Sequence, residues 1–141
     1  DVIKLSKAPI ICSHSSSMAM CKHDRNLTDD QLKALAQNGG VAQVCLLDRY
    51  INEDYKNASL TDAIEHIDHM VKVAGIDHVG IGSDFDGGGG IIGCESDNDF
   101  IQITVKLIEK GYTEEDIAKI WGGNLMRVLD EVQAAASVKT L

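Results

Sequence analysis

Short apolar runs and longer amphipathic segments alternate along the 141-residue chain. Three apolar runs, at residues 10–13, 41–47 and 79–81, are short enough to be buried strands of a parallel sheet. Between and after them lie segments whose apolar residues recur at helical spacing. The order strand, helix, strand, helix, strand and further helices predicts parallel βαβ units joined by right-handed crossovers.

The first two predicted helices carry start and stop signals. Residues 28–31, TDDQ, have the spacing of a capping box, and residues 38–40, NGG, favour the left-handed backbone that ends a helix. Ser59 is placed to cap a second helix, in which residues 60–74 form one wide apolar stripe before Gly75.

The rest of the chain is predicted to be mainly helical. A third helix covers residues 100–110, and Thr113 caps a short helix after it. Residues 122–124, GGN, are expected to separate that helix from a last amphipathic one. Residues 48–57 are polar and predict a loop, and the tail 134–141 is expected to fray.

Three parallel strands are few for a closed α/β fold. A complete (β/α)₈ barrel takes about 250 residues, and three of its strands alone expose sheet edges and half of a core. The chain is therefore either a small three-layer domain or the C-terminal part of a TIM-type barrel. No internal repeat or linker-like stretch divides residues 1–141.

Composition narrows the class of protein. Hydrophobic residues make up 44% and charged residues 25% of the chain, which is typical of a globular protein. The net charge of −9 argues against a nucleic-acid or anionic-membrane surface, because such surfaces need clustered Lys and Arg. No apolar run approaches the roughly 20 residues of a membrane helix. A first residue other than Met is expected of a processed or excised piece.

Four cysteines are spread along the chain, at positions 12, 21, 45 and 94. None forms a C-x-x-C pair, so a zinc finger is not expected. Cys12 and Cys45 lie inside apolar runs, where burial as small hydrophobes is the simpler interpretation. The pattern favours a reducing compartment over a disulfide framework.

Residues that could carry chemistry follow the first and third predicted strands. His14 ends the first, and Asp84 and Asp86 follow the third and lead into four glycines. Ligands meet the carboxyl ends of strands in parallel α/β folds, so these two strand ends are expected to face one site. His14 is interpreted as a structural histidine or a metal ligand, and Asp84 as a turn or capping residue or as a ligand or general base. The pair Asp86-Gly87 fits a turn better.

Other polar residues allow more than one interpretation. Arg25 lies in a loop after the first strand, either solvated or as a clamp for a carboxylate. Tyr50 follows the second strand and could reach the same edge. His66 and His69, one helical turn apart, could bind a metal, but packing and hydrogen bonding are favoured because no third ligand is evident.

Several familiar sites are not matched. The segment 84–90, DFDGGGG, has no side-chain ligand at the fifth position of a calcium loop and no Gly-Lys-Ser/Thr of a phosphate-binding loop. Ser13 and Ser15 flank His14 but lack the G-x-S-x-G elbow of a serine hydrolase.

Five motifs together resemble the membrane (renal) dipeptidase family of zinc peptidases. In chain order they are PIICSHSS at 9–16, DRN at 24–26, HIDH at 66–69, GIGSDFDG at 80–87 and GGNLMRVL at 122–129. Each is weak alone, but their order and spacing are specific, and the resemblance covers roughly residues 8–132.

The resemblance implies the fold and the chemistry. It implies the C-terminal part of a (β/α)₈ barrel similar to metal-dependent amidohydrolases, with two zinc ions at the mouth, and hydrolysis of dipeptides with tolerance for a C-terminal D-residue. By the same resemblance, His14 is a zinc ligand and Arg25 binds the terminal carboxylate of the substrate. Asp84 takes a proton from the attacking water and passes it to the leaving amine, and Tyr50 lines the substrate pocket.

The chain also departs from the family pattern. The resemblance implies that the metal site also needs an H-x-D pair on the first strand of the barrel, a bridging glutamate and another histidine, all of which are expected upstream of this chain. The alternative is therefore a non-catalytic barrel fragment that folds or assembles with a partner chain, and a third possibility is a parent that has lost activity or accepts another amide. The partners expected are a dipeptide, and either a second copy or the upstream half of the barrel. A bacterial, cytoplasmic relative is expected.

Overall fold

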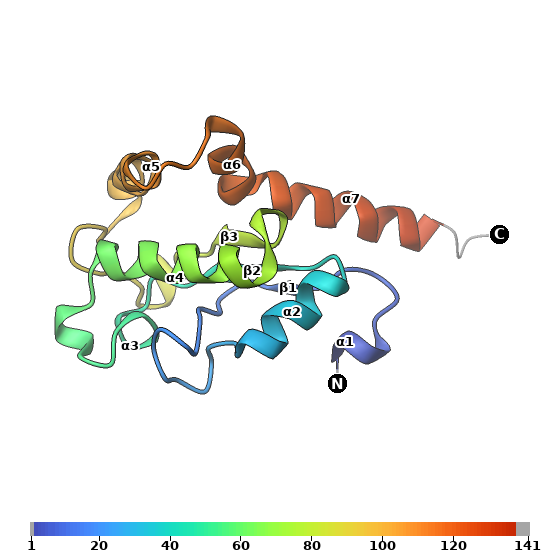
Figure 1. Ribbon diagram of the computed structural model, residues 1–141, viewed down its shortest axis with the longest axis horizontal. Coiled ribbons are helices and arrows are strands. Elements are labelled where there is room, and N and C mark those ends of the chain that lie inside the picture. Colours follow the sequence, from blue (N-terminus) through green and yellow to red (C-terminus); the bar gives the residue numbers. More distant parts are fainter. Residues whose placement is uncertain (1, 138–141) are drawn as a thin grey trace.

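Three short parallel strands form the sheet at the centre of the molecule (Figure 1). They are β1 (Ile11–Cys12), β2 (Val41–Val44) and β3 (Val79–Ile81), in the order β1-β2-β3. The computed structural model describes residues 2–137. Ala42 pairs with Cys12 on one side and with Val79 on the other. The parallel βαβ organisation predicted from the alternation of elements is confirmed.

The helices between the strands begin and end where their sequence signals predict. A short helix α1 (Val2–Leu5) precedes β1, α2 (Asp29–Gln37) connects β1 to β2, and α4 (Leu60–Ala74) connects β2 to β3. Capping boxes are present at Thr28 with Gln31 and at Ser59 with Asp62. Gly75 ends α4 at a φ of 93°, a value that favours glycine.

Helices follow β3 as predicted, with one difference. They are α5 (Phe100–Glu109), α6 (Glu114–Ala118), a π-helical turn (Lys119–Gly123) and α7 (Asn124–Ser137). The predicted break at 122–124 is confirmed as a kink, because Gly122 has a non-helical backbone, with φ 175° and ψ −19°, between α6 and α7. Residues 134–137 of the expected frayed tail are helical, and 138–141 lie outside the described residues.

The predicted loop over residues 48–57 is wrong in part. It contains helix α3 (Asp48–Ile51) and a 3₁₀ turn (Tyr55–Asn57). A single helical turn shows no apolar periodicity, and Ile51 is its one buried residue. Further 3₁₀ turns lie at Ile76–His78, Phe85–Gly87 and Asp97–Asp99.

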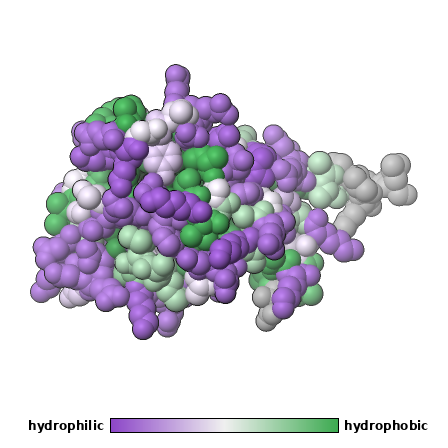
Figure 2. Space-filling model, in the orientation of Figure 1, coloured by the Kyte–Doolittle hydropathy of each residue, from purple (hydrophilic) through white to green (hydrophobic). Residues whose placement is uncertain are grey.

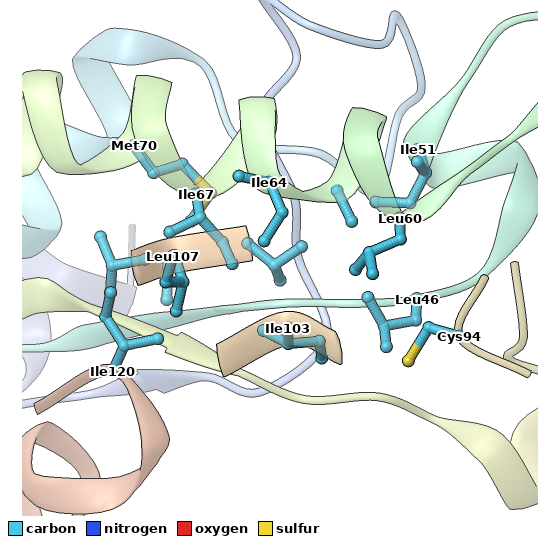
Figure 3. Packing of buried hydrophobic residues seen from close by; sticks show 14 of the residues in the cluster. Leu46, Ile51, Leu60, Ile64, Ile67, Met70, Cys94, Ile103, Leu107 and Ile120 are labelled. Atoms are coloured by element: carbon cyan, nitrogen blue, oxygen red, sulfur yellow. The ribbon is translucent and has the colours of Figure 1, made fainter. Parts of the chain in front are cut away.

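The main core lies where α4 packs against the sheet and α5 (Figure 3). Ile64 and Ile67 of α4 point toward Ile103 and Leu107 of α5, and all four are at most 2% exposed. Each such buried side chain contributes about 1.5–3 kcal/mol relative to its exposed state. This layer holds the strands in register, and the register determines which residues meet at the strand ends.

Hydrophilic side chains cover most of the face in Figure 2, with hydrophobic ones scattered between them. Among the described residues, no helix is both long and apolar enough to span a membrane.

Candidate active site

The carboxyl ends of β1 and β3 bring His14 and Asp84 together. The imidazole Nε2 lies 3.8 Å from the carboxylate Oδ1, and the side chains are 40% and 28% exposed. The predicted proximity of these two strand ends is therefore confirmed. Both groups are open enough to meet a ligand.

His14 is oriented by its neighbour and by the sheet. Its Nδ1 lies 2.8 Å from the Ser13 hydroxyl, and the Ser15 N–H donates to the Gln43 carbonyl at 3.0 Å, which continues the β1–β2 pairing beyond the strand. An imidazole whose Nδ1 is held in this way presents Nε2 to the site. A second group fixing the ring is the usual arrangement for a metal-binding histidine.

Asp84 lies on a loop whose two ends are both hydrogen-bonded to Leu46, which follows β2. The Leu46 N–H donates to the Ser83 carbonyl at 3.2 Å, and the Gly90 N–H donates to the Leu46 carbonyl at 2.8 Å. Asp84 itself has a left-handed backbone, with φ 65° and ψ 31°. A non-glycine residue in this region is uncommon and persists where the surroundings fix it.

The glycines after Asp84 shape the turn, as predicted, and one also makes room for the carboxylate. The N–H groups of Gly87 and Gly89 donate to the Asp84 carbonyl at 3.0 and 2.7 Å. A Cβ on Gly87 would lie 2.2 Å from Asp84 Oδ1, so only glycine fits while the carboxylate keeps this position. The Asp84 side chain makes no helix-capping bond.

Cys45 contacts the other oxygen of the same carboxylate. Its buried thiol donates to Asp84 Oδ2 at 3.7 Å. Burial raises the pKa of this thiol to about 11; the charge of Asp84 also raises it, and that of Arg25 lowers it. The thiol therefore stays protonated and acts as a donor. Burial as a small hydrophobe was predicted, but this polar contact was missed, although the place of Cys45 directly after β2 was a signal for it.

Arg25 and Tyr50 lie against each other at this end of the molecule. The guanidinium carbon of Arg25 is 5.9 Å from the centroid of the Tyr50 ring, and the His23 ring is 4.4 Å from the same ring. Arg25 is exposed and forms no ion pair with a carboxylate of residues 2–137. The positive charge of Arg25 lowers the pKa of the Cys45 thiol, which in turn contacts Asp84.

His66 and His69 belong to the packing of the fold, as favoured from the sequence. His66 is 1% exposed; its Nδ1 accepts from the Ser17 N–H and its Nε2–H donates to the Ile51 carbonyl, each at 3.0 Å. His69 lies 2.8 Å from an oxygen of Asp29. Within the part of the chain that the structure describes, no three or more His, Cys, Asp or Glu side chains are grouped to hold a metal ion.

We expect the stability of the protein to fall in mild acid because His66 must stay neutral. Burial lowers the pKa of His66, and the nearby His69 lowers it further. The hydrogen bond to the Ile51 carbonyl and the charge of Asp62 raise this pKa, but burial has the larger effect. The unfolded state binds a proton near pH 6.5, whereas the folded state does not, so the free energy of unfolding is fully retained above that pH and decreases as the pH falls toward the folded-state pKa. Urea unfolding of the full-length protein between pH 7.5 and 5.5 measures this.

His66→Gln is the comparison for that measurement, because a glutamine side chain does not titrate. A smaller loss of stability between the two pH values is expected in the variant than in the wild type. Equal losses would contradict the assignment to His66.

Comparison with known proteins places this geometry in a family. The family described as membrane dipeptidase, peptidase family M19, matches residues 1–141. A dipeptidase, aclJ, of Aspergillus oryzae is 38% identical over 137 residues, which are 96% of this chain and 32% of that protein.

Solved structures of similar proteins have the same fold over most of this chain. The probable dipeptidase PvdM from Pseudomonas aeruginosa superposes with a TM-score of 0.88 at 31% identity, over 94% of this chain and 47% of that one. A metallopeptidase from Rhodobacter sphaeroides, liganded with a phosphinate mimic of the dipeptide L-Ala-D-Ala, superposes with a TM-score of 0.87 at 29% identity, over 92% and 38% of the two chains.

The chain thus spans about a third of the curated relative and less than half of each solved structure. The similarity confirms the expected α/β fold, which is part of an amidohydrolase-like (β/α)₈ barrel. The resemblance inferred from the five motifs is confirmed as well. The chain belongs to the membrane dipeptidase family, peptidase family M19.

Proposed function

We propose that the protein containing this chain is a zinc-dependent dipeptidase. The observation that carries the proposal is the approach of His14 Nε2 to Asp84 Oδ1 within 3.8 Å at the carboxyl edge of the sheet, in a chain of a dipeptidase family. Residues 1–141 would form one portion of a single barrel domain.

The donors in this chain fit part of a zinc site. Imidazole nitrogen and carboxylate oxygen are both zinc ligands, and a site draws on three or four side chains. His14 would hold the ion through Nε2. Within residues 2–137 no three or more donor side chains are grouped, so the remaining ligands must lie outside these residues. Bound zinc supplies Lewis-acid polarisation of the scissile carbonyl and lowers the pKa of water. The proposal of two ions rests on the family resemblance.

Asp84 is proposed to handle the proton of the reaction. Its carboxylate is held on the Oδ2 side by the Cys45 thiol, while Oδ1 faces His14. A carboxylate so placed can accept a proton from the attacking water and deliver it to the amine that leaves when the peptide bond breaks. Oδ1 is the oxygen available for this transfer.

Arg25 and Tyr50 are proposed to bind the substrate. A guanidinium without a carboxylate partner suits a terminal carboxylate, which it can bind through two parallel hydrogen bonds. The Tyr50 ring beneath it would line the pocket and restrict its motion. Tolerance for a D-residue at the C-terminal position is proposed too, and the ligand of the R. sphaeroides structure, a mimic of L-Ala-D-Ala, supports it.

Arg25→Ala is expected to raise KM for a dipeptide about a hundredfold, because a charge-assisted bidentate contact is worth about 3 kcal/mol. The same substitution should leave kcat/KM nearly unchanged for a dipeptide whose C-terminus is amidated. Steady-state kinetics on this substrate pair measure the difference. An equal loss on both substrates would contradict a role in carboxylate binding.

The test of the proposed function is hydrolysis of a panel of L-L and L-D dipeptides by the full-length protein, with zinc and after chelation. Turnover that is lost on chelation and restored by zinc is expected. No turnover of any dipeptide would refute the proposal. The 141-residue chain alone is expected to be inactive, since it supplies only part of the donor set; turnover by it alone would refute that part.

A non-catalytic fragment that assembles with a partner chain is the second candidate, and the incomplete donor set favours it. Restoration of zinc binding on mixing with the upstream half of the barrel would support assembly. We also propose a cytoplasmic location, supported by the four free thiols.

A further inference from the structure

One buried amide group connects three segments at the candidate site. Asn26 is 2% exposed. Its Oδ1 accepts from the Ser16 N–H at 3.1 Å, and its Nδ2 donates to the carbonyls of Cys21 at 2.9 Å and Tyr50 at 2.8 Å. Only a neutral amide supplies an acceptor and two donors at one position. Every polar atom of this buried side chain is therefore used.

The bonds of Asn26 end beside residues of the proposed site. Arg25 directly precedes Asn26 in the chain, and Tyr50 is bonded through its own carbonyl. Ser16, the third partner, lies two residues after His14. The backbone at Arg25 and the backbone at Tyr50 are thereby fixed relative to each other, although the two residues are far apart in sequence.

The network continues from Asn26 to the catalytic carboxylate of the proposal. The Ser16 hydroxyl accepts from the Cys45 N–H and donates to the Cys45 carbonyl, each at 3.3 Å. The Cys45 thiol then donates to Asp84. Buried polar networks in which every member is satisfied hold a single arrangement.

We propose that Asn26 is a positioning residue for substrate binding, which acts by holding Arg25 against Tyr50. This inference rests on the proposed dipeptidase function. The guanidinium is on a loop and the ring is on the single-turn helix α3. The hydrogen bond from Asn26 to the Tyr50 carbonyl connects these two segments directly beneath both side chains. Asn26 does not touch the substrate itself.

Asn26→Ala in the full-length protein is the test. The variant leaves the Ser16 N–H and two carbonyls without their partner, so Arg25 is no longer held in place. KM for a dipeptide should rise about tenfold, with kcat changed by less than about threefold, since a misplacement near 1 Å is enough for such an effect. The preference for the dipeptide over its C-terminal amide should fall by the same factor.

Asn124→Ala is the matched control. Asn124 is 3% exposed, and its Nδ2 donates to the carbonyls of Ile76 at 2.7 Å and Val79 at 2.8 Å, at the opposite end of β3. The two variants lose similar buried hydrogen bonds, so a similar decrease in Tm is expected for both. Only the Asn26 variant should lose the preference for the free carboxylate.

A double-mutant cycle separates positioning from general loss of structure. If Asn26 acts through Arg25, the double variant Arg25→Ala/Asn26→Ala should have about the KM of Arg25→Ala alone; effects that multiply would overturn the inference. Asn26→Ser, which keeps one hydroxyl, replaces the alanine variant if that variant does not fold. Equal preferences in Asn26→Ala and Asn124→Ala would overturn this inference alone, whereas a wild-type protein without turnover would overturn the proposed function and this inference with it.

Discussion

Asp84→Asn is expected to lower kcat for dipeptide hydrolysis by about a thousandfold, within the range of general acid–base catalysis. The amide has nearly the shape of the carboxylate and can still accept from the Cys45 thiol through its oxygen. It cannot accept a proton from the attacking water. KM should change little, because Arg25 and Tyr50 are proposed to bind the substrate. Steady-state kinetics on the full-length protein give both constants.

Asp86→Asn is the control for that experiment. Asp86 is two residues further along the same loop, is exposed, and forms no hydrogen bond or ion pair with His14 or Cys45, whose partner is Asp84. Its substitution removes one negative charge from the same loop and should leave kcat within about twofold, the effect of a surface charge. If both variants lose activity equally, local charge and not proton transfer by Asp84 explains the loss. If Asp84→Asn keeps its kcat, Asp84 is not the proton carrier.

The approach of Asp84 to His14 could be predicted because it follows from a general property of parallel sheets. Three short apolar runs separated by helices place all carboxyl ends at one edge, so residues that follow different strands become neighbours. The helix boundaries were equally accessible, since the capping boxes at Thr28 and Ser59 are local signals. Nothing beyond the order of elements was needed for this part of the site.

The supporting contacts could not be predicted in the same way. Asn26 reaches Ser16 and Tyr50 across 10 and 24 residues, and such pairs are set by register and loop path. Gly87 looked like one of several turn glycines, and only the position of the Asp84 carboxylate shows why a side chain is excluded there. Local patterns predict elements, whereas these contacts depend on how the elements are packed.

His14→Ala is expected to weaken zinc binding by the full-length protein by about a hundredfold or more, since even outer-shell partners of metal ligands contribute 10- to 100-fold. Competition with a chromophoric zinc chelator measures this without reference to turnover. The imidazole is held at Nδ1 by Ser13 and presents Nε2 to the site, so alanine removes a donor already oriented in the protein. Activity should fall with zinc occupancy and recover in part at high zinc concentration.

His69→Ala provides the contrast, because it removes a second histidine that lies beside an aspartate. His69 Nε2 is 2.8 Å from Asp29 Oδ1, a direct hydrogen bond that leaves no space for an ion between the two groups. His14 Nε2 and Asp84 Oδ1 are 3.8 Å apart, too far for such a bond, so both groups remain available to a ligand. Zinc affinity should therefore be unchanged in His69→Ala. A loss in that variant, or wild-type affinity in His14→Ala, would place the metal elsewhere and remove the basis for assigning His14 as a ligand.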